Sequence, residues 1–305
     1  MTLLCAVWAL QQISLKAVSA QAAPMLMVAL RSWAALVLLL ALMHFGGETP
    51  WQRRGTGALK RWKPGLAAGA LFALEFVLVA LALRLTLASH VVVFLYTAPV
   101  FAALGLQRWL PAERLAPLQW GGIALAFGGV ALSFAGGGAA SGEDAARGAA
   151  LLGDALALMA GAAWGATTVT LRCSALAHAP ATETLAYQLL CAAVLLMPAA
   201  WLTGQWHFEP VAAAWMHLAF QSLVVSFASF LAWFWLLRHY LASRLGVFSF
   251  LTPLSGVLLG AVLLDEALEP RFVAGSAGVL AGIALVSGHA GLARRWAARR
   301  RPAAS

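Results

Sequence analysis

The sequence has few charged residues. Only 10% of its 305 residues are Asp, Glu, Lys or Arg, whereas about 25% are charged in an ordinary soluble domain. So few charges cannot cover the surface of a water-soluble fold of this size, which excludes a soluble enzyme, a disordered chain and a nucleic-acid-binding module. Hydrophobic residues instead make up 62% of the chain, and the mean hydropathy is +0.85. The composition therefore predicts an integral membrane protein.

Recognisable catalytic and metal-binding motifs are also missing. The three cysteines, Cys5, Cys173 and Cys191, show neither metal-ligand spacing nor a disulfide framework, so we interpret them as small packing residues. The seven histidines form no HxxxH or HExxH pair, and the absence of a GxxxxGK[ST] loop excludes the usual P-loop hydrolysis of ATP. We therefore expect no catalytic residue, no metal site and no cofactor.

Ten apolar runs are each long enough to cross a bilayer, which takes about 20 residues of helix. The loops between them are short, and no soluble domain fits there. The sequence thus predicts an all-α integral membrane protein with ten transmembrane helices. The runs extend from Thr2 to Ala20, Met25 to Phe45, Pro64 to Leu83, Ala88 to Leu110, Leu118 to Ala135, Leu151 to Leu171, Thr184 to Leu202, Ala213 to Leu237, Ser243 to Leu264 and Arg271 to Gly291.

The excess of positive charge, a net +9, predicts how these helices are oriented. If the N-terminus is cytoplasmic, most Lys and Arg residues fall in cytoplasmic loops or in the C-terminal tail, as the positive-inside rule requires. The outer loops then hold only Lys16, Arg84, Arg147 and Arg271. We therefore expect a multi-pass protein of the inner membrane with both termini in the cytoplasm. The alternative, cleavage of the first run near Ala20–Ala22, is disfavoured because that run lacks a positively charged start.

The two halves of the chain resemble each other. Residues 1–136 and 151–291 each contain five of the predicted helices, while residues 137–150 form an outer linker and residues 292–305 a basic cytoplasmic tail. Because five is odd, the two units would cross the membrane in opposite orientations around a central cavity, as the inverted repeats of secondary transporters do. The matching residues are Ala88-Ser89 with Ala242-Ser243, Pro99 with Pro253, Glu113 with Glu266, Gly122 with Gly275, Gly129 with Gly282 and, more faintly, Trp8, Lys16 and Pro24 with Trp164, Arg172 and Pro180.

These repeated residues resemble those of the drug/metabolite transporter superfamily, in particular its ten-helix EamA type. The resemblance rests on Trp164-Gly165, on the basic residue eight positions after Trp8 and after Trp164, and on the paired prolines and glutamates. It implies a basket of helices around a central cavity lined by helices 1–4 and 6–9, with helices 5 and 10 to the side. It also implies export of amino acids, their derivatives or other small metabolites, and the chain is similar to amino-acid exporters of the YddG kind.

Two charged residues lie inside predicted spans. Glu75 is in the middle of the third run, where a carboxylate is costly unless it is paired, protonated or hydrated. It either faces the cavity, where it binds a substrate amine or takes a proton, or it is a structural acid that is protonated or paired with an arginine. Arg31, in the second run, keeps its charge and either receives a substrate carboxylate, pairs with Glu75 or snorkels to the outer interface. The matching positions of the second unit are Ser229 and Tyr187.

Prolines interrupt the fourth and ninth runs, at Pro99 and Pro253. A proline inside a helix removes one backbone hydrogen bond and bends the helix, and the freed carbonyl groups then need a hydroxyl such as that of Thr97, water or a neighbouring helix. We expect a hinge at each proline, although a bent and packed helix would show the same pattern. Small-xxx-small pairs such as Gly161–Gly165 and Gly278–Gly282 predict close helix crossings.

Polar and aromatic residues of the other runs complete the candidate site. Polar side chains in spanning helices usually face protein or a water-filled cavity, and helix packing is the alternative role for each of them. Glu113 and Glu266, at loop edges, are expected to cap helix ends. The candidate substrate-binding residues are Trp8, Gln11, Gln12, Arg31, Glu75, His90, Tyr96, Trp164, Thr168, Tyr187, Phe227, Ser229, Trp233 and Phe248.

We therefore expect a secondary transporter that exports small metabolites, in the first place neutral or aromatic amino acids, by alternating access. A multidrug exporter of lipophilic cations is the alternative within transport, since it also needs a buried carboxylate and aromatic residues. A membrane enzyme or a non-transporting subunit is disfavoured because no nucleophile–base pair is visible. The expected partners are a small-molecule substrate and the lipid bilayer, with no nucleic acid; the sequence leaves the oligomeric state open, with a monomer favoured.

Overall fold

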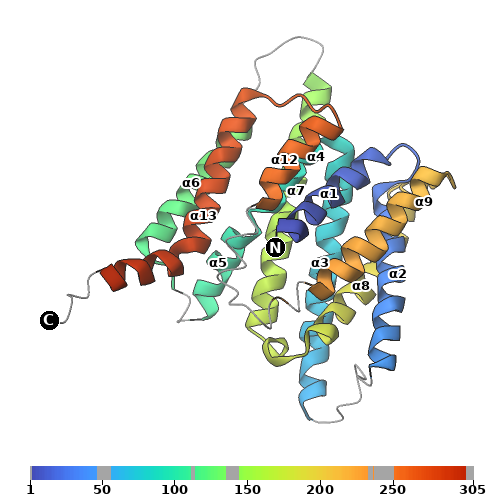
Figure 1. Cartoon of the computed structure of the whole chain (residues 1–305), viewed down its shortest axis with the longest axis horizontal. Helices are drawn as coiled ribbons and strands as arrows, with labels where there is room; N and C mark the ends of the chain where they lie inside the picture. The colour runs from blue at the N-terminus through green and yellow to red at the C-terminus, as the bar shows by residue number, and fades with distance from the viewer. Residues whose placement is uncertain are drawn as a thin grey trace.

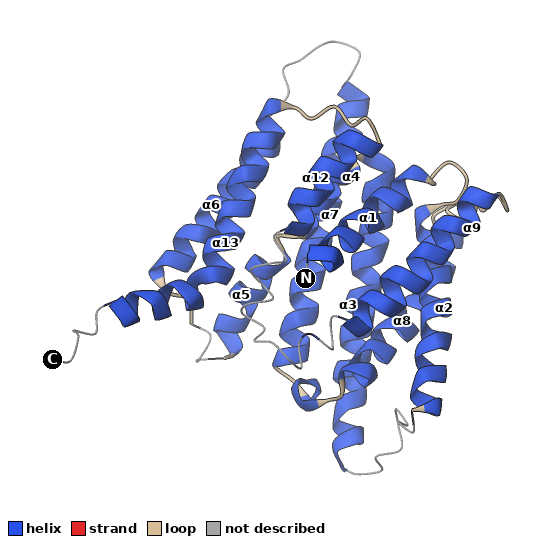
Figure 2. Cartoon of the chain, viewed as in Figure 1, coloured by secondary structure: helices blue, strands red, loops and turns tan. Residues whose placement is uncertain are grey.

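The computed structural model of the chain describes residues 2–46, 56–110, 114–134, 144–232, 236 and 251–299. Within these ranges every named element is a helix, and the one strand-like contact is an isolated bridge between Ala22 and Phe208 (Figure 1, Figure 2). The elements are α1 (Thr2–Ala17), α2 (Pro24–Phe45), α3 (Thr56–Leu85), α4 (Ala88–Leu95), α5 (Ala98–Trp109), α6 (Pro117–Phe134), α7 (Asp144–Arg172), η2 (Ala175–His178), α8 (Ala181–Leu202), α9 (Ala212–Ala219), η3 (Phe220–Ser229), α12 (Leu251–Leu263) and α13 (Pro270–Arg299).

Each predicted apolar run overlaps at least one of these helices. Six of the described helical segments are long and apolar enough to cross a membrane, and two shorter helices are also apolar. The prediction of an all-α protein that crosses the membrane several times is thereby confirmed.

Three helices extend beyond their apolar runs. α3 begins at Thr56 and α7 begins at Asp144, so part of the expected linker 137–150 is helical. α13 continues to Arg299 and includes part of the expected tail 292–305. The added stretches are rich in Ala, Lys and Arg, which are strong helix formers. Hydropathy alone therefore placed these helix ends too close to the apolar segments.

The fourth predicted run forms two helices instead of one. α4 ends at Leu95 and α5 begins three residues later, so the chain breaks just ahead of Pro99. Pro99 has no N–H group for the carbonyl oxygen of Leu95, which interrupts the helix there. The Thr97 hydroxyl donates a hydrogen bond of 2.6 Å to the Phe94 carbonyl oxygen. The helix is thus interrupted at Pro99, whereas Pro253 lies in the first turn of α12 and the residues before that helix are outside the described part.

The helices pack into a large bundle with one pair at its edge. α6 and α13 lie side by side at that edge (Figure 1). In the bundle, α3 packs against α7 and α8, α2 packs against α8 and η3, and α4 packs against α7 and α12. α1 packs against α12, and α5 packs against α7. One large hydrophobic core contains buried side chains from α1, α2, α3, α4, α6, α7, α8 and α13.

Glycines at the α6–α13 crossing show that these two helices run antiparallel. A Cβ atom added to Gly122 would lie 2.8 Å from the carbonyl oxygen of Gly282, and one added to Gly129 would lie 2.5 Å from that of Gly275. The order of the contacts is therefore reversed along the second helix. Backbones that approach so closely leave room only for glycine. The predicted close crossing at Gly278–Gly282 is confirmed.

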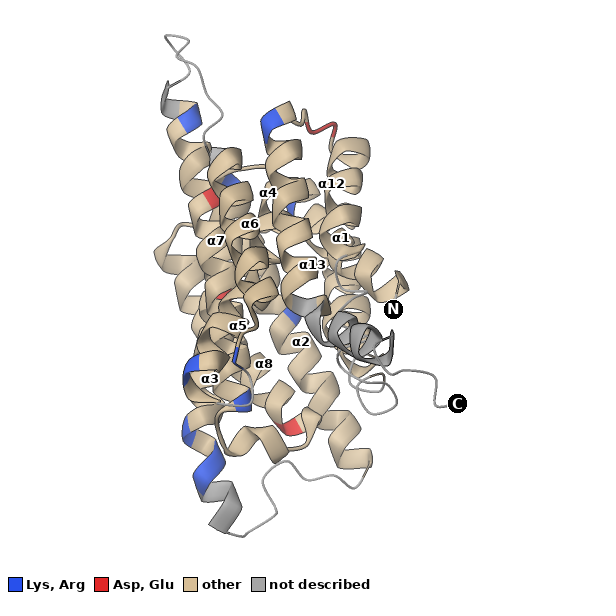
Figure 3. Cartoon of the chain, turned by 90° about the vertical axis from the view of Figure 1, so that its left-hand side faces the viewer, with Lys and Arg blue, Asp and Glu red and all other residues tan. Residues whose placement is uncertain are grey.

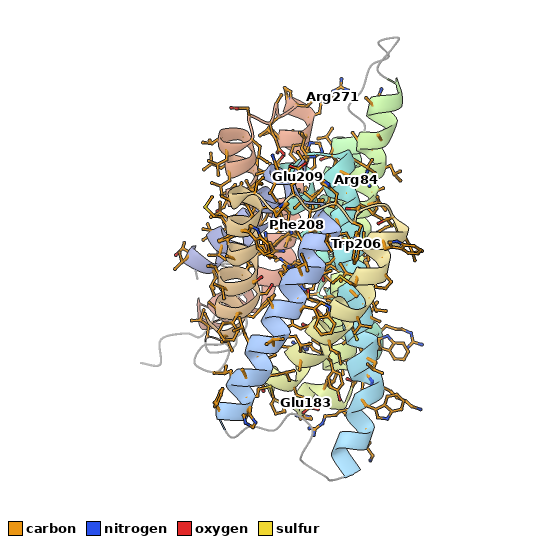
Figure 4. The ribbon with its side chains drawn as sticks, turned by 90° about the vertical axis from the view of Figure 1, so that its right-hand side faces the viewer. Arg84, Glu183, Trp206, Phe208, Glu209 and Arg271 are labelled. Atoms are coloured by element: carbon orange, nitrogen blue, oxygen red, sulfur yellow. The ribbon has the colours of Figure 1, made fainter. Side chains whose placement is uncertain are left out.

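Most charged residues of the described part lie toward the two ends of the bundle (Figure 3). Arg84, Arg271 and Glu209 lie at one end, which we call the Arg271 end, and Glu183 lies at the other, which we call the Glu183 end (Figure 4). At the Glu183 end, Arg61 Nε is 3.3 Å from Glu183 Oε1, and this ion pair joins α3 to α8. The apolar stretch between the two ends is what the hydrocarbon core of a bilayer requires.

Candidate functional site

Arg31 of α2 and Glu75 of α3 are both buried in the bundle. Arg31 is 2% exposed and Glu75 is 5% exposed, so neither side chain snorkels to a surface. The two groups interact electrostatically, but neither takes part in an ion pair with another described residue. Arg31 Nε and Glu75 Oε2 are both buried without a hydrogen-bond partner. Buried charges are normally paired and hydrogen-bonded, so these two atoms mark Arg31 and Glu75 as the candidate site.

The guanidinium of Arg31 is held by a residue that the sequence analysis missed. Arg31 Nη1 donates a hydrogen bond of 2.6 Å to Gln221 Oε1, and Gln221 Nε2 donates one of 2.8 Å to the backbone carbonyl oxygen of Gln11. Arg31 Cζ also lies 4.5 Å from the centre of the Phe76 ring, a cation–π geometry. These contacts tie α1, α2, α3 and η3 together around one fixed positive charge.

Gln221 belongs to the π-helical segment η3. In a π-helix each N–H group bonds the carbonyl group five residues earlier. Such segments are rare in proteins, and those that occur are often found at functional sites. Four of the five buried residues of η3 are polar, namely Gln221, Ser222, Ser226 and Ser229. The buried residues recur every four positions, so Gln221 and Ser222 share the face of the helix that points to the interior. The signal in the sequence was the set of polar residues within an apolar run.

Aromatic candidates from both halves of the chain contact residues of other helices. Trp8 Nε1 donates a hydrogen bond of 3.0 Å to Ser229 Oγ. The rings of Tyr96 and Trp164 meet edge to face with centroids 5.2 Å apart, and Tyr96 interacts electrostatically with Glu75. The structure thus places Trp8 beside Ser229 and Tyr96 beside Trp164, and it ties Arg31 to the backbone of Gln11 through Gln221.

His90 lies apart from this group, at the Arg271 end. Its ring stacks on Phe272 at 3.7 Å, and its Nδ1 is 3.0 Å from both carboxylate oxygens of Asp154. Asp154, which is 3% exposed, also accepts a hydrogen bond of 2.6 Å from the Thr86 hydroxyl. The sequence analysis missed Asp154, although an acid inside an apolar run was a visible signal. The cluster joins the α3–α4 connection to α7.

Two ionic side chains cap helix ends close to this cluster. Lys16 Nζ donates hydrogen bonds to the carbonyl oxygens of Leu83 (2.5 Å) and Thr86 (2.8 Å), at the C-terminus of α3. Glu266 accepts hydrogen bonds from the backbone N–H groups of Ala88 (2.6 Å) and Ser89 (3.0 Å), at the N-terminus of α4. Both charges have the sign that the helix dipole favours. The predicted capping role of Glu266 is confirmed, and Glu113 lies outside the described residues.

Of the remaining candidates within the described ranges, only Thr168 has a side-chain hydrogen bond to a residue named above, and that bond lies within its own helix. A Cβ atom added to Gly65 would lie 2.7 Å from the Tyr187 ring, so Tyr187 packs against the start of α3. The Thr168 hydroxyl donates to the Trp164 carbonyl oxygen at 3.2 Å, Gln12 Oε1 is buried without a partner, and Phe227 is half-buried. The candidates that lie outside the described residues are Trp233 and Phe248.

Metal binding finds no support in the described part of the chain. Across those ranges, no three His, Cys, Asp or Glu side chains are grouped so that they could hold a metal ion. At the centre of the site, Arg31 Nε and Glu75 Oε2, one atom of a cation and one of an anion, are buried without a hydrogen-bond partner. Such a pair of opposite charges can bind a polar organic molecule.

Comparison with known proteins agrees with the fold and with the repeat in the sequence. The EamA-like transporter family matches residues 1–135 and again residues 151–288. No curated protein matches the chain. A solved structure titled "Crystal structure of protein" has a similar fold, with a TM-score of 0.64, 23% sequence identity and 96% of each chain covered. Since the family model covers most of the sequence, this multi-pass membrane protein belongs to the EamA-like transporter family, whose membership implies a transporter of small molecules.

Proposed function

We propose that the protein is a secondary transporter that exports neutral or aromatic amino acids across the inner membrane by alternating access. The observation that carries this proposal is the buried pair Arg31 and Glu75, each with a polar atom that has no partner. Charged residues inside a membrane protein usually mark a path for substrate or ions. Trp8, Tyr96 and Trp164 offer aromatic surface to an apolar side chain.

The contacts between helices support two inverted five-helix units. α6 and α13, which close the two units, are antiparallel, and α1 packs against α12 as α7 packs against α4 and α5. Gly161 of α7 lies against the α4–α5 break, where an added Cβ atom would be 2.8 Å from the Phe94 carbonyl oxygen. Cys5 is the matching residue of α1 and is 0% exposed. The hydrogen bond between Arg31 of the first unit and Gln221 of the second then lies where the units meet, which is where inverted-repeat transporters bind substrate.

The same arrangement supports the proposed orientation. Arg84, Arg271 and Glu209, which the charge pattern assigns to outer loops, share one end, and Glu183 lies at the other (Figure 4). The Arg271 end would face outward and both termini inward. When this end opens, the Lys16 and Asp154 contacts that tie α1, α3, α4 and α7 together would break, while the α4–α5 break acts as a hinge.

Export of lipophilic cations is a second candidate, because Glu75 and the aromatic residues would also suit such a substrate. The permanent positive charge of Arg31 argues against it, since a buried guanidinium close to the site repels a cation. An amino acid brings its own carboxylate and avoids this repulsion. The proposal is therefore specific to substrates that carry both signs of charge.

Transport into proteoliposomes tests the proposal. Purified protein is reconstituted, and uptake of radiolabelled phenylalanine and leucine is measured with and without a pH gradient. We expect uptake above that of protein-free liposomes, and we expect Glu75→Gln to depress it while the protein still folds. Flux of tetraphenylphosphonium without flux of any amino acid would favour the second candidate, and no flux of either kind would contradict transport.

A further inference from the structure

We propose that Arg31 and Glu75 bind the two ends of one zwitterion, with the substrate carboxylate on Arg31 and the substrate ammonium group on Glu75. The inference rests on the proposed function and adds the chemistry by which the site recognises its substrate. It follows from the contacts of the two side chains: Arg31 lies over the ring of Phe76, the residue next to Glu75 in the chain, while Arg31 Nε and Glu75 Oε2 have no hydrogen-bond partner. Gln221, which no sequence motif marked, acts as the residue that positions Arg31.

Arg31 is arranged as a receptor for a carboxylate. A guanidinium has five N–H donors in a planar fork that fits a carboxylate with two parallel hydrogen bonds. Gln221 occupies Nη1, whereas Nε is buried and has no partner. Phe76 covers one face of the guanidinium plane at 4.5 Å. The edge that contains Nε is therefore the part of the fork left for a ligand.

Gln221 is itself fixed, which keeps the guanidinium in place. Its amide nitrogen donates to the Gln11 carbonyl oxygen at 2.8 Å, so its Oε1 must point toward Arg31. The residue is 0% exposed, and no solvent competes for these bonds. An arginine held in this way loses little conformational entropy when a ligand binds.

Glu75 presents the complementary group. Its Oε2 atom is buried without a hydrogen-bond partner, and a carboxylate accepts hydrogen bonds from an ammonium group. The ring of Phe76, the residue after Glu75, lies 4.5 Å from the Arg31 guanidinium, so aromatic surface adjoins the proposed site. An apolar or aromatic substrate side chain would pack against this aromatic surface.

A zwitterion explains why the two charges are neighbours yet unpaired. A structural ion pair inside a protein gains most when its charges touch and share hydrogen bonds. Arg31 instead donates to the neutral Gln221 while Glu75 Oε2 stays without a partner. A bound zwitterion adds one charge of each sign and leaves the net charge of the interior unchanged. A substrate with one charge would leave the opposite protein charge buried and uncompensated.

Ligand displacement on the intact protein in detergent tests this inference. Binding of labelled phenylalanine is competed by phenylalanine, by phenethylamine, which lacks the carboxylate, and by 3-phenylpropionate, which lacks the ammonium group. One charge-assisted hydrogen bond contributes about 10- to 100-fold in affinity. We therefore expect both single-charge analogues to compete at least about tenfold more weakly than phenylalanine. Equal competition by all three compounds on the wild-type protein would overturn the inference without any variant.

Two variants assign the ends of the substrate. Arg31→Gln is expected to weaken the binding of phenylalanine and 3-phenylpropionate but not that of phenethylamine. Glu75→Gln is expected to weaken the binding of phenylalanine and phenethylamine but not that of 3-phenylpropionate. Arg61→Gln and Glu183→Gln are matched controls, because they make the same changes in an ion pair at the Glu183 end. These controls should leave the order of the three competitors unchanged. A variant of Arg31 or Glu75 that binds all three compounds as the wild type does would refute its role.

The same measurements separate this inference from the proposed function. Selective binding of phenylalanine without flux in proteoliposomes would leave the zwitterion site standing and remove the transport proposal. If amino acids are transported but the three compounds compete in the same order in Arg31→Gln and Glu75→Gln as in the wild type, the transport proposal stands and the zwitterion site is refuted. If the glutamine variants fail to fold, Arg31→Lys and Glu75→Asp keep each charge, and we expect them to retain the wild-type preference for the zwitterion.

Discussion

Replacing Gly129 with alanine is expected to destabilise the protein, whereas the same change at Gly128 is not. A Cβ atom at position 129 would lie 2.5 Å from the Gly275 carbonyl oxygen and 2.6 Å from the Val279 amide nitrogen. Ordinary contact begins at 3.4 Å, so α6 and α13 must separate by about 0.9 Å, the difference between the two distances. Backbone atoms make these contacts, and no side-chain rotation can relieve them. A Cβ atom at Gly128 meets nothing within 4 Å.

The magnitude follows from two opposing terms. Overpacking costs about 1–3 kcal/mol, and alanine regains up to about 1 kcal/mol of helix propensity over glycine. Because the clash is with backbone, we expect Gly129→Ala to lower the free energy of unfolding by about 2 kcal/mol and Gly128→Ala to leave it unchanged or raise it slightly. Reversible unfolding by SDS in mixed micelles measures both variants. Equal midpoints for the two would refute the close antiparallel crossing.

Three further predictions concern buried polar contacts. Glu266→Gln should lower the free energy of unfolding by about 1–2 kcal/mol because a charged cap is lost from the α4 N-terminus. Glu269→Gln, in the same loop and exposed, should leave it unchanged. Thermal unfolding in detergent compares the two variants. Asp154→Ala should cost about 1–3 kcal/mol by the same assay because the buried hydroxyl of Thr86 and the ring of His90 lose their acceptor, and Asp154→Asn, which keeps an acceptor, should cost less. A double-mutant cycle of Trp8→Phe and Ser229→Ala should give a coupling energy of about 1 kcal/mol, and additive effects would contradict their hydrogen bond.

The helices and the break at Pro99 could be predicted from the residues of each segment alone. Hydropathy located the spans because a bilayer demands about 20 apolar residues from each of them. The bend at Pro99 followed from the missing N–H group, and the crossing at Gly278–Gly282 followed from the absence of side chains. These features depend on one segment at a time, which explains why the sequence shows them.

The contents of the site depended on tertiary contacts and were only partly predicted. Arg31 and Glu75 stood out because charge in an apolar run is costly. Gln221 did not, because its role depends on contacts with α1 and α2. His90 was assigned to the substrate site, yet its partner Asp154 at the Arg271 end is visible only once α4 and α7 are packed together.

Accessibility of Ser222 tests the central claim of alternating access to a buried polar site most directly. Ser222 is 5% exposed and its hydroxyl has no partner, so Ser222→Cys changes little in size. The variant is made with Cys5, Cys173 and Cys191 replaced by serine, and a membrane-impermeant thiol reagent is applied from each side of oriented vesicles. We predict that the thiol reacts from both sides and that phenylalanine slows both reactions. A thiol that never reacts from either side, with or without phenylalanine, would contradict the account.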